Sequence, residues 1–110
     1  MIILIIVIPP FFIVPSHTKP SDAVAEIDHL DNVFHAASNH FGTDLGIIMG
    51  DLNADCSYVS NTKYTNLDLI VDTNFTWWID KEADTTTRDS NCAYDRLIMN
   101  VFHQYSHITL

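Results

Sequence analysis

The chain has 110 residues, of which 47% are hydrophobic and 17% are charged, and its formal net charge is -9. This length fits one domain or part of one, and the composition is typical of a globular chain and excludes an intrinsically disordered one. Five basic residues against 14 acidic ones argue against passive electrostatic binding of nucleic acid, which depends on Lys and Arg.

The first predicted strand, Phe11 to Val14, follows an apolar start. Residues 1–8 are apolar enough for the hydrophobic part of a signal peptide, but no basic residue precedes them and no small-residue cleavage site follows. They are also too few, and too close to Pro9 and Pro10, to span a bilayer as a helix. We therefore expect a second buried strand or a degraded signal there, and no stable membrane association.

An amphipathic helix is predicted after this strand. Ser21 or Asp22 can cap its start, and Gly42 suits a left-handed cap at its end. Its apolar face consists of residues that recur every three or four positions, namely Val24, Ile27, Leu30 and Phe34. The uninterrupted apolar run from Leu45 to Met49 then predicts a strand covered on both faces.

The second half of the chain alternates short apolar and polar segments. Residues 61–66 are polar and turn-rich, and Leu67 to Leu69 and Phe75 to Ile79 are predicted strands joined by a turn. Residues 80–91 are predicted to form a polar loop, and Tyr94 to Met99 the last strand. The order strand, helix, strand and then several strands predicts an α/β layered fold.

Two cysteines, Cys56 and Cys92, leave two possibilities open: one disulfide that closes a long loop around Trp77 and Trp78, or two free buried thiols. Because side chains alternate along a strand, one of these tryptophans is expected in the core and the other partly exposed. The triplet that begins at Asn74 is an N-glycosylation sequon, which is weak support for secretion.

Polar side chains follow the ends of the predicted strands. His17 lies just past the first strand, Asp51 and Asn53 lie past the next, and Asp95 lies at the start of the last. In layered α/β proteins ligand sites gather at strand ends. An imidazole for proton transfer, carboxylates for a divalent cation and an amide for a phosphoryl oxygen are the groups that hydrolysis of a phosphodiester requires. These four residues therefore predict a phosphodiester-hydrolysing site.

Each of these residues also has a local explanation. A histidine in a loop is usually only solvated, and Asp51 with Asn53 after Gly50 could make an Asx-turn. Asp95 could form an ordinary ion pair with its neighbour Arg96. Spacing alone leaves these alternatives open.

Longer strings between Phe11 and Met99 are more specific: FIVPSHTKPSDAVAEIDHL, MGDLNADCSYV, FTWWI, ADTTT and NCAYDRLI. Together they resemble the deoxyribonuclease I family, whereas G-D-x-N by itself would fit the wider endonuclease/exonuclease/phosphatase superfamily. The resemblance implies a four-layer α/β sandwich. Residues 1–110 would then be a single partial domain of that type, with one sheet and a packed helix, and residues 1–10 and 100–110 are atypical flanks.

The resemblance also implies roles for individual residues. His17 would be a general acid/base, Asp51 and Asn53 would contact metal and the scissile phosphate, and Asp95 would orient a second catalytic histidine. A structural Ca²⁺ would be bound by Asp84, Thr86, the backbone of Arg88, and Ser90. The implied cofactors are Mg²⁺ and Ca²⁺.

The implied function is that of a secreted endonuclease that hydrolyses DNA, and Cys56 and Cys92 match the structural disulfide of the family. The sequence gives no expectation for binding of actin. The glutamate that pairs with the catalytic histidine and the second catalytic histidine have no counterpart here, so we expect little or no activity of this chain alone and an exposed apolar sheet face. Alternatives are a non-catalytic domain that binds Ca²⁺ or a protein, and a related phosphodiesterase.

Overall fold

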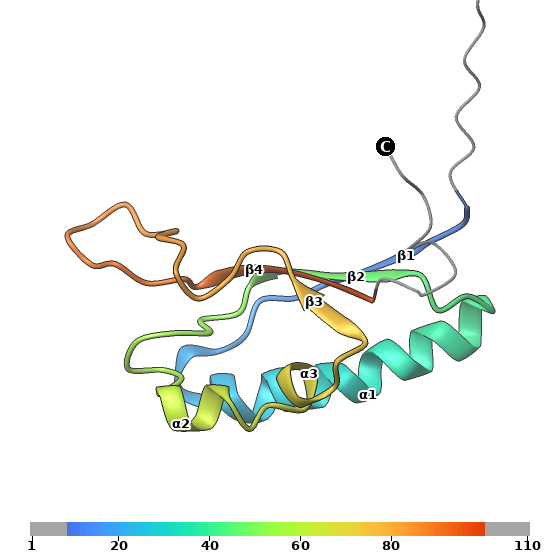
Figure 1. Ribbon diagram of the computed structural model, residues 1–110, viewed down its shortest axis with the longest axis horizontal. Coiled ribbons are helices and arrows are strands. Elements are labelled where there is room, and N and C mark those ends of the chain that lie inside the picture. Colours follow the sequence, from blue (N-terminus) through green and yellow to red (C-terminus); the bar gives the residue numbers. More distant parts are fainter. Residues whose placement is uncertain (1–8, 101–110) are drawn as a thin grey trace, which may run out of the picture.

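The computed structural model describes residues 9–100, so the expectations for residues 1–8 and 101–110 lie outside the described residues. The four strands of this part form one sheet (Figure 1), and their order in it is β1-β2-β4-β3. Their bounds are Phe12–Pro15 for β1, Gly46–Asp51 for β2, Phe75–Trp77 for β3 and Asp95–Asn100 for β4. β1 and β2 are parallel, and β4 runs antiparallel to both of its neighbours. The predicted α/β class is confirmed.

A long helix, α1 (Ala23–Phe41), packs on one face of this sheet after a single 3-10 turn, η1 (Pro20–Asp22). The side chain of Glu26 accepts the backbone N–H of Lys19 at 2.8 Å, whereas the side chain of Asp22 makes no capping bond. Gly42 ends the helix at a φ of 66°, and its N–H donates to Ser38. The left-handed cap predicted from the sequence is therefore present.

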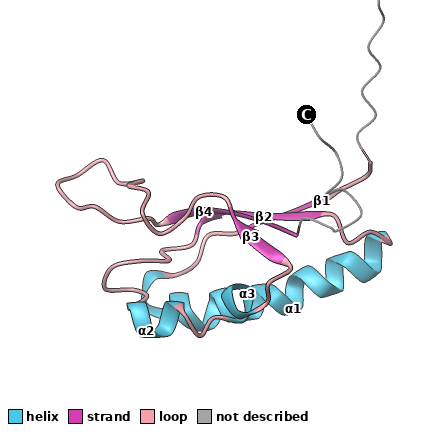
Figure 2. Cartoon of the chain, in the orientation of Figure 1, coloured by secondary structure: helices cyan, strands magenta, loops and turns pink. Residues whose placement is uncertain are grey.

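The two faces of the sheet differ in what covers them. Val14, Ile48 and Ile98 lie in register across β1, β2 and β4 and are buried on the side of α1, which we term the covered face. The alternate residues point to the open face, where Ile13 is 50% exposed and Met49 is 41% exposed. Figure 2 shows the helices on one side of the sheet only. The strand predicted to be covered on both faces is thus covered on one, as far as residues 9–100 are concerned.

Two short helices, α2 (Asn61–Tyr64) and α3 (Asp68–Val71), connect β2 to β3. The strand predicted at Leu67 to Leu69 is wrong, because Asp68 begins α3. The backbone N–H of Asp68 donates to a carboxylate oxygen of Asp28 on α1 at 3.1 Å, which satisfies an amide that a helix start otherwise leaves unpaired. This hydrogen bond joins residues 40 positions apart in the sequence.

Cys56 and Cys92 form a disulfide with a Cα–Cα distance of 5.9 Å, so the alternative of free thiols is excluded. Closing a loop of this length stabilises a fold by about 4 kcal/mol. Trp77 is half-buried against the core, and its indole N–H donates to a backbone carbonyl, whereas Trp78 is exposed, as the alternation predicted. Asn74 is exposed. No helix among the described residues has the length and apolar character needed to cross a bilayer.

Candidate active site

The loop after β1 is fixed alongside the end of β2. The backbone N–H of Ser16 donates to the backbone carbonyl of Met49 at 2.9 Å, and the backbone N–H of Thr18 donates to the backbone carbonyl of Asp51 at 3.0 Å. Gly50 makes this approach possible, because a Cβ at this position would lie 1.9 Å from the carbonyl oxygen of Ser16. Its φ of 142° also lies in the region that favours glycine. The residue between Ser16 and Thr18 is His17, which is thereby held over the tip of β2.

His17 and Asp51 face each other in solvent. Nε2 of His17 lies 3.6 Å from Oδ2 of Asp51, and the two side chains are 75% and 41% exposed. This separation is too long for a hydrogen bond and short enough for electrostatic attraction. The carboxylate is therefore close enough to orient the imidazole, and the ring is accessible to water.

Asn53 is buried and holds the histidine loop. Its side-chain amide donates to the carbonyl of Thr18 at 2.9 Å, and its backbone N–H donates to Oδ1 of Asp51 at 3.1 Å. The second of these bonds is the Asx-turn that the sequence allowed. The hydroxyl of Thr18 donates in turn to the carbonyl of Leu52 at 2.7 Å. In this arrangement the amide of Asn53 fixes the backbone beside His17.

Asp95 lies directly opposite Asp51 in the antiparallel register of β2 and β4, and both line an open pocket of about 440 Å³. Opposed side chains of such strands have Cβ atoms about 5 Å apart, and like charges there repel. Within residues 9–100 neither carboxylate pairs with Lys or Arg. A site with two such acids is suited to a divalent cation.

Arg96 does not pair with Asp95, because it points to the opposite face of the sheet. Its side chain is almost fully buried and donates three hydrogen bonds, at 2.8 to 3.1 Å, to the backbone carbonyls of Ala93, Ile79 and Ala54. The guanidinium also lies 5.4 Å from the ring of Tyr64 and 5.3 Å from that of Trp77. Burial lowers the pKa of Arg96 from its ordinary value. The ion-pair explanation of Asp95 is therefore excluded.

The loop predicted to bind calcium borders the same pocket, which Thr86, Arg88 and Ser90 help to line. Oδ1 of Asp84 accepts the backbone N–H of Thr86 at 3.0 Å and its hydroxyl at 2.7 Å. The hydrogen bond from this hydroxyl is the main cause that lowers the pKa of Asp84. The Thr86 hydroxyl also lies against the carbonyl oxygen of Ser90. Several oxygens thus converge, although Arg88 and Ser90 remain exposed.

Sequence reasoning did not identify the supporting roles of Thr18 and Arg96. Thr18 is a buried hydroxyl next to His17, and no pattern marked it as anything but a loop residue. Arg96 could have been found, since alternation along a strand places it on the face opposite to Asp95.

No protein-family model matches the chain. Deoxyribonuclease-1 from Ovis aries is 44% identical to it over 89 residues, which are 81% of this chain and 34% of that protein. Deoxyribonuclease-1 from Homo sapiens is 43% identical over 89 residues, with 81% and 32% covered. Deoxyribonuclease gamma from Rattus norvegicus is 43% identical over 90 residues, with 81% and 29% covered. The chain thus spans about a third of the length of the curated relatives it matches.

Proposed function

Because the chain is a homologue of deoxyribonuclease-1 and deoxyribonuclease gamma, we propose that it is part of a secreted, divalent-metal-dependent endonuclease that hydrolyses DNA. The observation that carries this proposal is the placement of His17 beside Asp51, with Asp95 opposite on the neighbouring strand. The disulfide and the exposed sequon at Asn74 support secretion, since disulfides persist in oxidising compartments.

His17 is the proton-transfer group in this proposal. An exposed imidazole near a carboxylate can take a proton from water or return one to a leaving oxygen at neutral pH. Asp51 orients the ring through its Oδ2 atom, and Asn53 keeps the loop in place through the carbonyl of Thr18. Proton transfer by a positioned side chain contributes about 10²- to 10⁴-fold in rate.

A divalent cation fits the opposed carboxylates. Asp51 would hold Mg²⁺. Asp95, opposite it on β4, would either share the cation or orient a second catalytic histidine. When bound, Mg²⁺ would neutralise charge on the phosphoryl oxygens. The chain's net charge of -9 makes this neutralisation more important, because DNA would otherwise be repelled.

We propose that these residues are one portion of the active site and that the 110-residue chain alone has little or no activity. His17 is the one imidazole that the described residues place beside Asp51, whereas hydrolysis needs both a base for the water and an acid for the leaving group. Loss of one member of a catalytic unit can cost nearly as much as loss of all.

A chimera tests the assignment. Residues 11–99 would replace the matching segment of deoxyribonuclease-1 from Ovis aries, and plasmid cleavage would be measured with Mg²⁺ and Ca²⁺. We expect the chimera to cut DNA and His17→Ala to lower its rate about 10²- to 10⁴-fold. His29→Ala is the matched control, because His29 is an exposed histidine on α1, remote in sequence from the strand ends.

Two results would contradict the proposal. One is a folded chimera, with its disulfide formed, whose rate does not respond to His17→Ala. The other is cleavage of plasmid DNA by the isolated 110-residue chain that is lost in its own His17→Ala variant, which would overturn the assignment of low activity.

A second candidate function, non-catalytic calcium binding, is favoured by the oxygens that converge at Asp84, Thr86 and Ser90. Calorimetric titration of the chain with Ca²⁺ tests it. We expect binding that Asp84→Ala abolishes and that the neighbouring Asp89→Ala leaves unchanged. Titration without heat of binding in the wild-type chain would exclude this function.

A further inference from the structure

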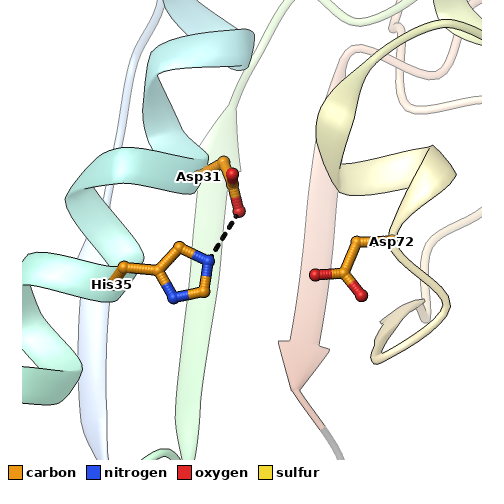
Figure 3. Close-up of side chains that lie close together, drawn as sticks. All are labelled: Asp31, His35 and Asp72. Atoms are coloured by element: carbon orange, nitrogen blue, oxygen red, sulfur yellow. Dashed lines mark ion pairs between the residues drawn. The ribbon is translucent and has the colours of Figure 1, made fainter.

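We infer that Asp31, His35 and Asp72 form a binding site for a divalent transition-metal ion, with Zn²⁺ as the best fit. Asp31 and His35 belong to α1, and Asp72 follows the last residue of α3 (Figure 3). One ligand atom from each of the three lies within 4.8 Å of the other two. The cluster is made of residues other than those assigned to hydrolysis, and this inference does not depend on the proposed function.

The first two donors are one helical turn apart. Nε2 of His35 lies 3.1 Å from Oδ1 of Asp31, and the Asp31 side chain is only 21% exposed. These two atoms form an ion pair (Figure 3), and the buried Oδ1 atom accepts no hydrogen bond. A shared cation could use both atoms as ligands, because they already lie close together.

The third donor comes from a segment distant in sequence. The carboxylate of Asp72 is turned toward the Asp31–His35 pair (Figure 3). Oδ1 of Asp72 accepts the backbone N–H of Asn74 at 2.9 Å, which fixes the side chain while leaving further lone pairs on the carboxylate. The bond from Asp68 to Asp28 holds α3 against α1 at the same place. The three donors are therefore positioned by the fold.

The donor set decides which ion fits. One imidazole nitrogen with two carboxylate oxygens suits zinc, whereas Ca²⁺ and Mg²⁺ prefer oxygen donors only. Zinc–ligand distances of about 2.0–2.2 Å place neighbouring donors of a tetrahedral site about 3.5 Å apart, so a small side-chain rotation would complete it. Three protein ligands leave a position for water.

The charge around the cluster also favours a cation. Asp31 and Asp72 contribute two negative charges, and across residues 9–100 neither pairs with Lys or Arg. Asp28 and Asp68 add two more acids at the same contact between α1 and α3. A divalent ion would offset the charge of Asp31 and Asp72 and would link α3 to the long helix.

The test uses the 110-residue chain freed of metal by chelator. Zn²⁺ is titrated by calorimetry, and thermal unfolding is followed with and without Zn²⁺, Ca²⁺ or Mg²⁺. We expect saturable binding of Zn²⁺ and a rise in Tm with Zn²⁺ that the cluster variants lose, since a ligand that binds the folded state stabilises it. Any rise in Tm with Ca²⁺ or Mg²⁺, bound elsewhere, should be the same in the wild-type chain and in the cluster variants. Asp72→Asn and His35→Gln should each weaken binding at least about tenfold, since even loss of an outer-shell partner costs about 10- to 100-fold.

His40→Gln is the control, because it removes another exposed α1 histidine that is not in the cluster. The NMR signals of the histidine rings give a readout that needs no variant: Zn²⁺ should shift those of His35 and leave those of His29 and His40 in place. Absence of saturable binding, equal affinity in the cluster variants and the control, or equal shifts of all three rings would overturn the site.

Discussion

The covered and open faces of the sheet are built from neighbouring residues of the same strands, yet they have different surroundings. Ile48 is fully buried against the helix side, and Ile47, one residue earlier, is only half-buried. Both are isoleucines in the middle of β2, so composition cannot explain the contrast. Apolar residues of the described strands therefore occupy two kinds of position: those that are buried on the covered face, and those that are exposed or half-buried on the open face.

The strongest test of this contrast is truncation of the two isoleucines. Ile48→Ala should lower the free energy of unfolding by about 3 kcal/mol, because it leaves a cavity in a packed core. Ile47→Ala should lower it by about 1 kcal/mol. Urea unfolding followed by circular dichroism measures both. Equal losses would mean that the open face is packed in solution and would remove the distinction.

Arg96 and Leu97 are a second pair of neighbouring residues that point to opposite faces of the sheet, and they test the contribution of a buried polar side chain to stability. Arg96→Lys should destabilise the chain by about 2 kcal/mol, because a lysine cannot replace three hydrogen bonds from a planar guanidinium. Leu97→Lys, on the open face, should cost less than about 1 kcal/mol. The same urea titration gives both values, and a tolerated Arg96→Lys would show that the three carbonyls find other donors.

Self-association of the chain provides a test of the open face. Contiguous exposed apolar surface favours association. The double variant Ile13→Lys with Met49→Lys should therefore reduce concentration-dependent association in sedimentation velocity, with stability changed by about 0.5 kcal/mol. Val33→Lys, an exposed apolar position on α1, is the control and should have no effect on association. A wild-type chain that stays monomeric over the whole concentration range would contradict the expectation.

The smallest expected effect concerns the hydrogen bond between Thr86 and Asp84, which lies in the loop before β4 and not in the sheet. Thr86→Val removes the hydroxyl that donates to Asp84, so the pKa of Asp84 should rise toward its ordinary value of 3.8. NMR titration of the side-chain carboxyl carbon measures this change. Thr87→Val is the control and should leave the titration unchanged.

The sign of the pH effect follows from the lowered pKa. The Asp84–Thr86 contact stabilises the folded loop fully above the ordinary pKa of 3.8, and its contribution is lost as the pH falls through the lower folded value. An Asp84 carboxyl that titrates at its ordinary value in the wild-type chain would disprove the contact.

The strands and α1 were predictable because their signals are local. The recurrence of Ile27, Leu30 and Phe34 gave the buried face of the helix, and Gly42 gave its end. The strands after Leu45 and after Tyr94 followed from apolar runs bounded by polar segments. These patterns need no knowledge of distant residues.

What the sequence could not predict depends on distant contacts. The segment at Leu67 to Leu69 alternates like a strand, but in the structure it starts α3, where the N–H of Asp68 donates to the carboxylate of Asp28 on α1. The hydrogen bond from Asn53 to the Thr18 carbonyl spans 35 residues, so the sequence suggested a free amide where the structure has an engaged one. The approach of Asp72 to α1 likewise required the folded chain.

Gly50 has a consequence for how this chain can change. The Ser16 carbonyl occupies the space that any larger residue would need, and the next residue along that loop is His17. Replacement would therefore displace the imidazole from Asp51 even though neither residue had been altered. In a saturation library, the codon for position 50 should tolerate almost no variation, and its failures would resemble those of His17 itself.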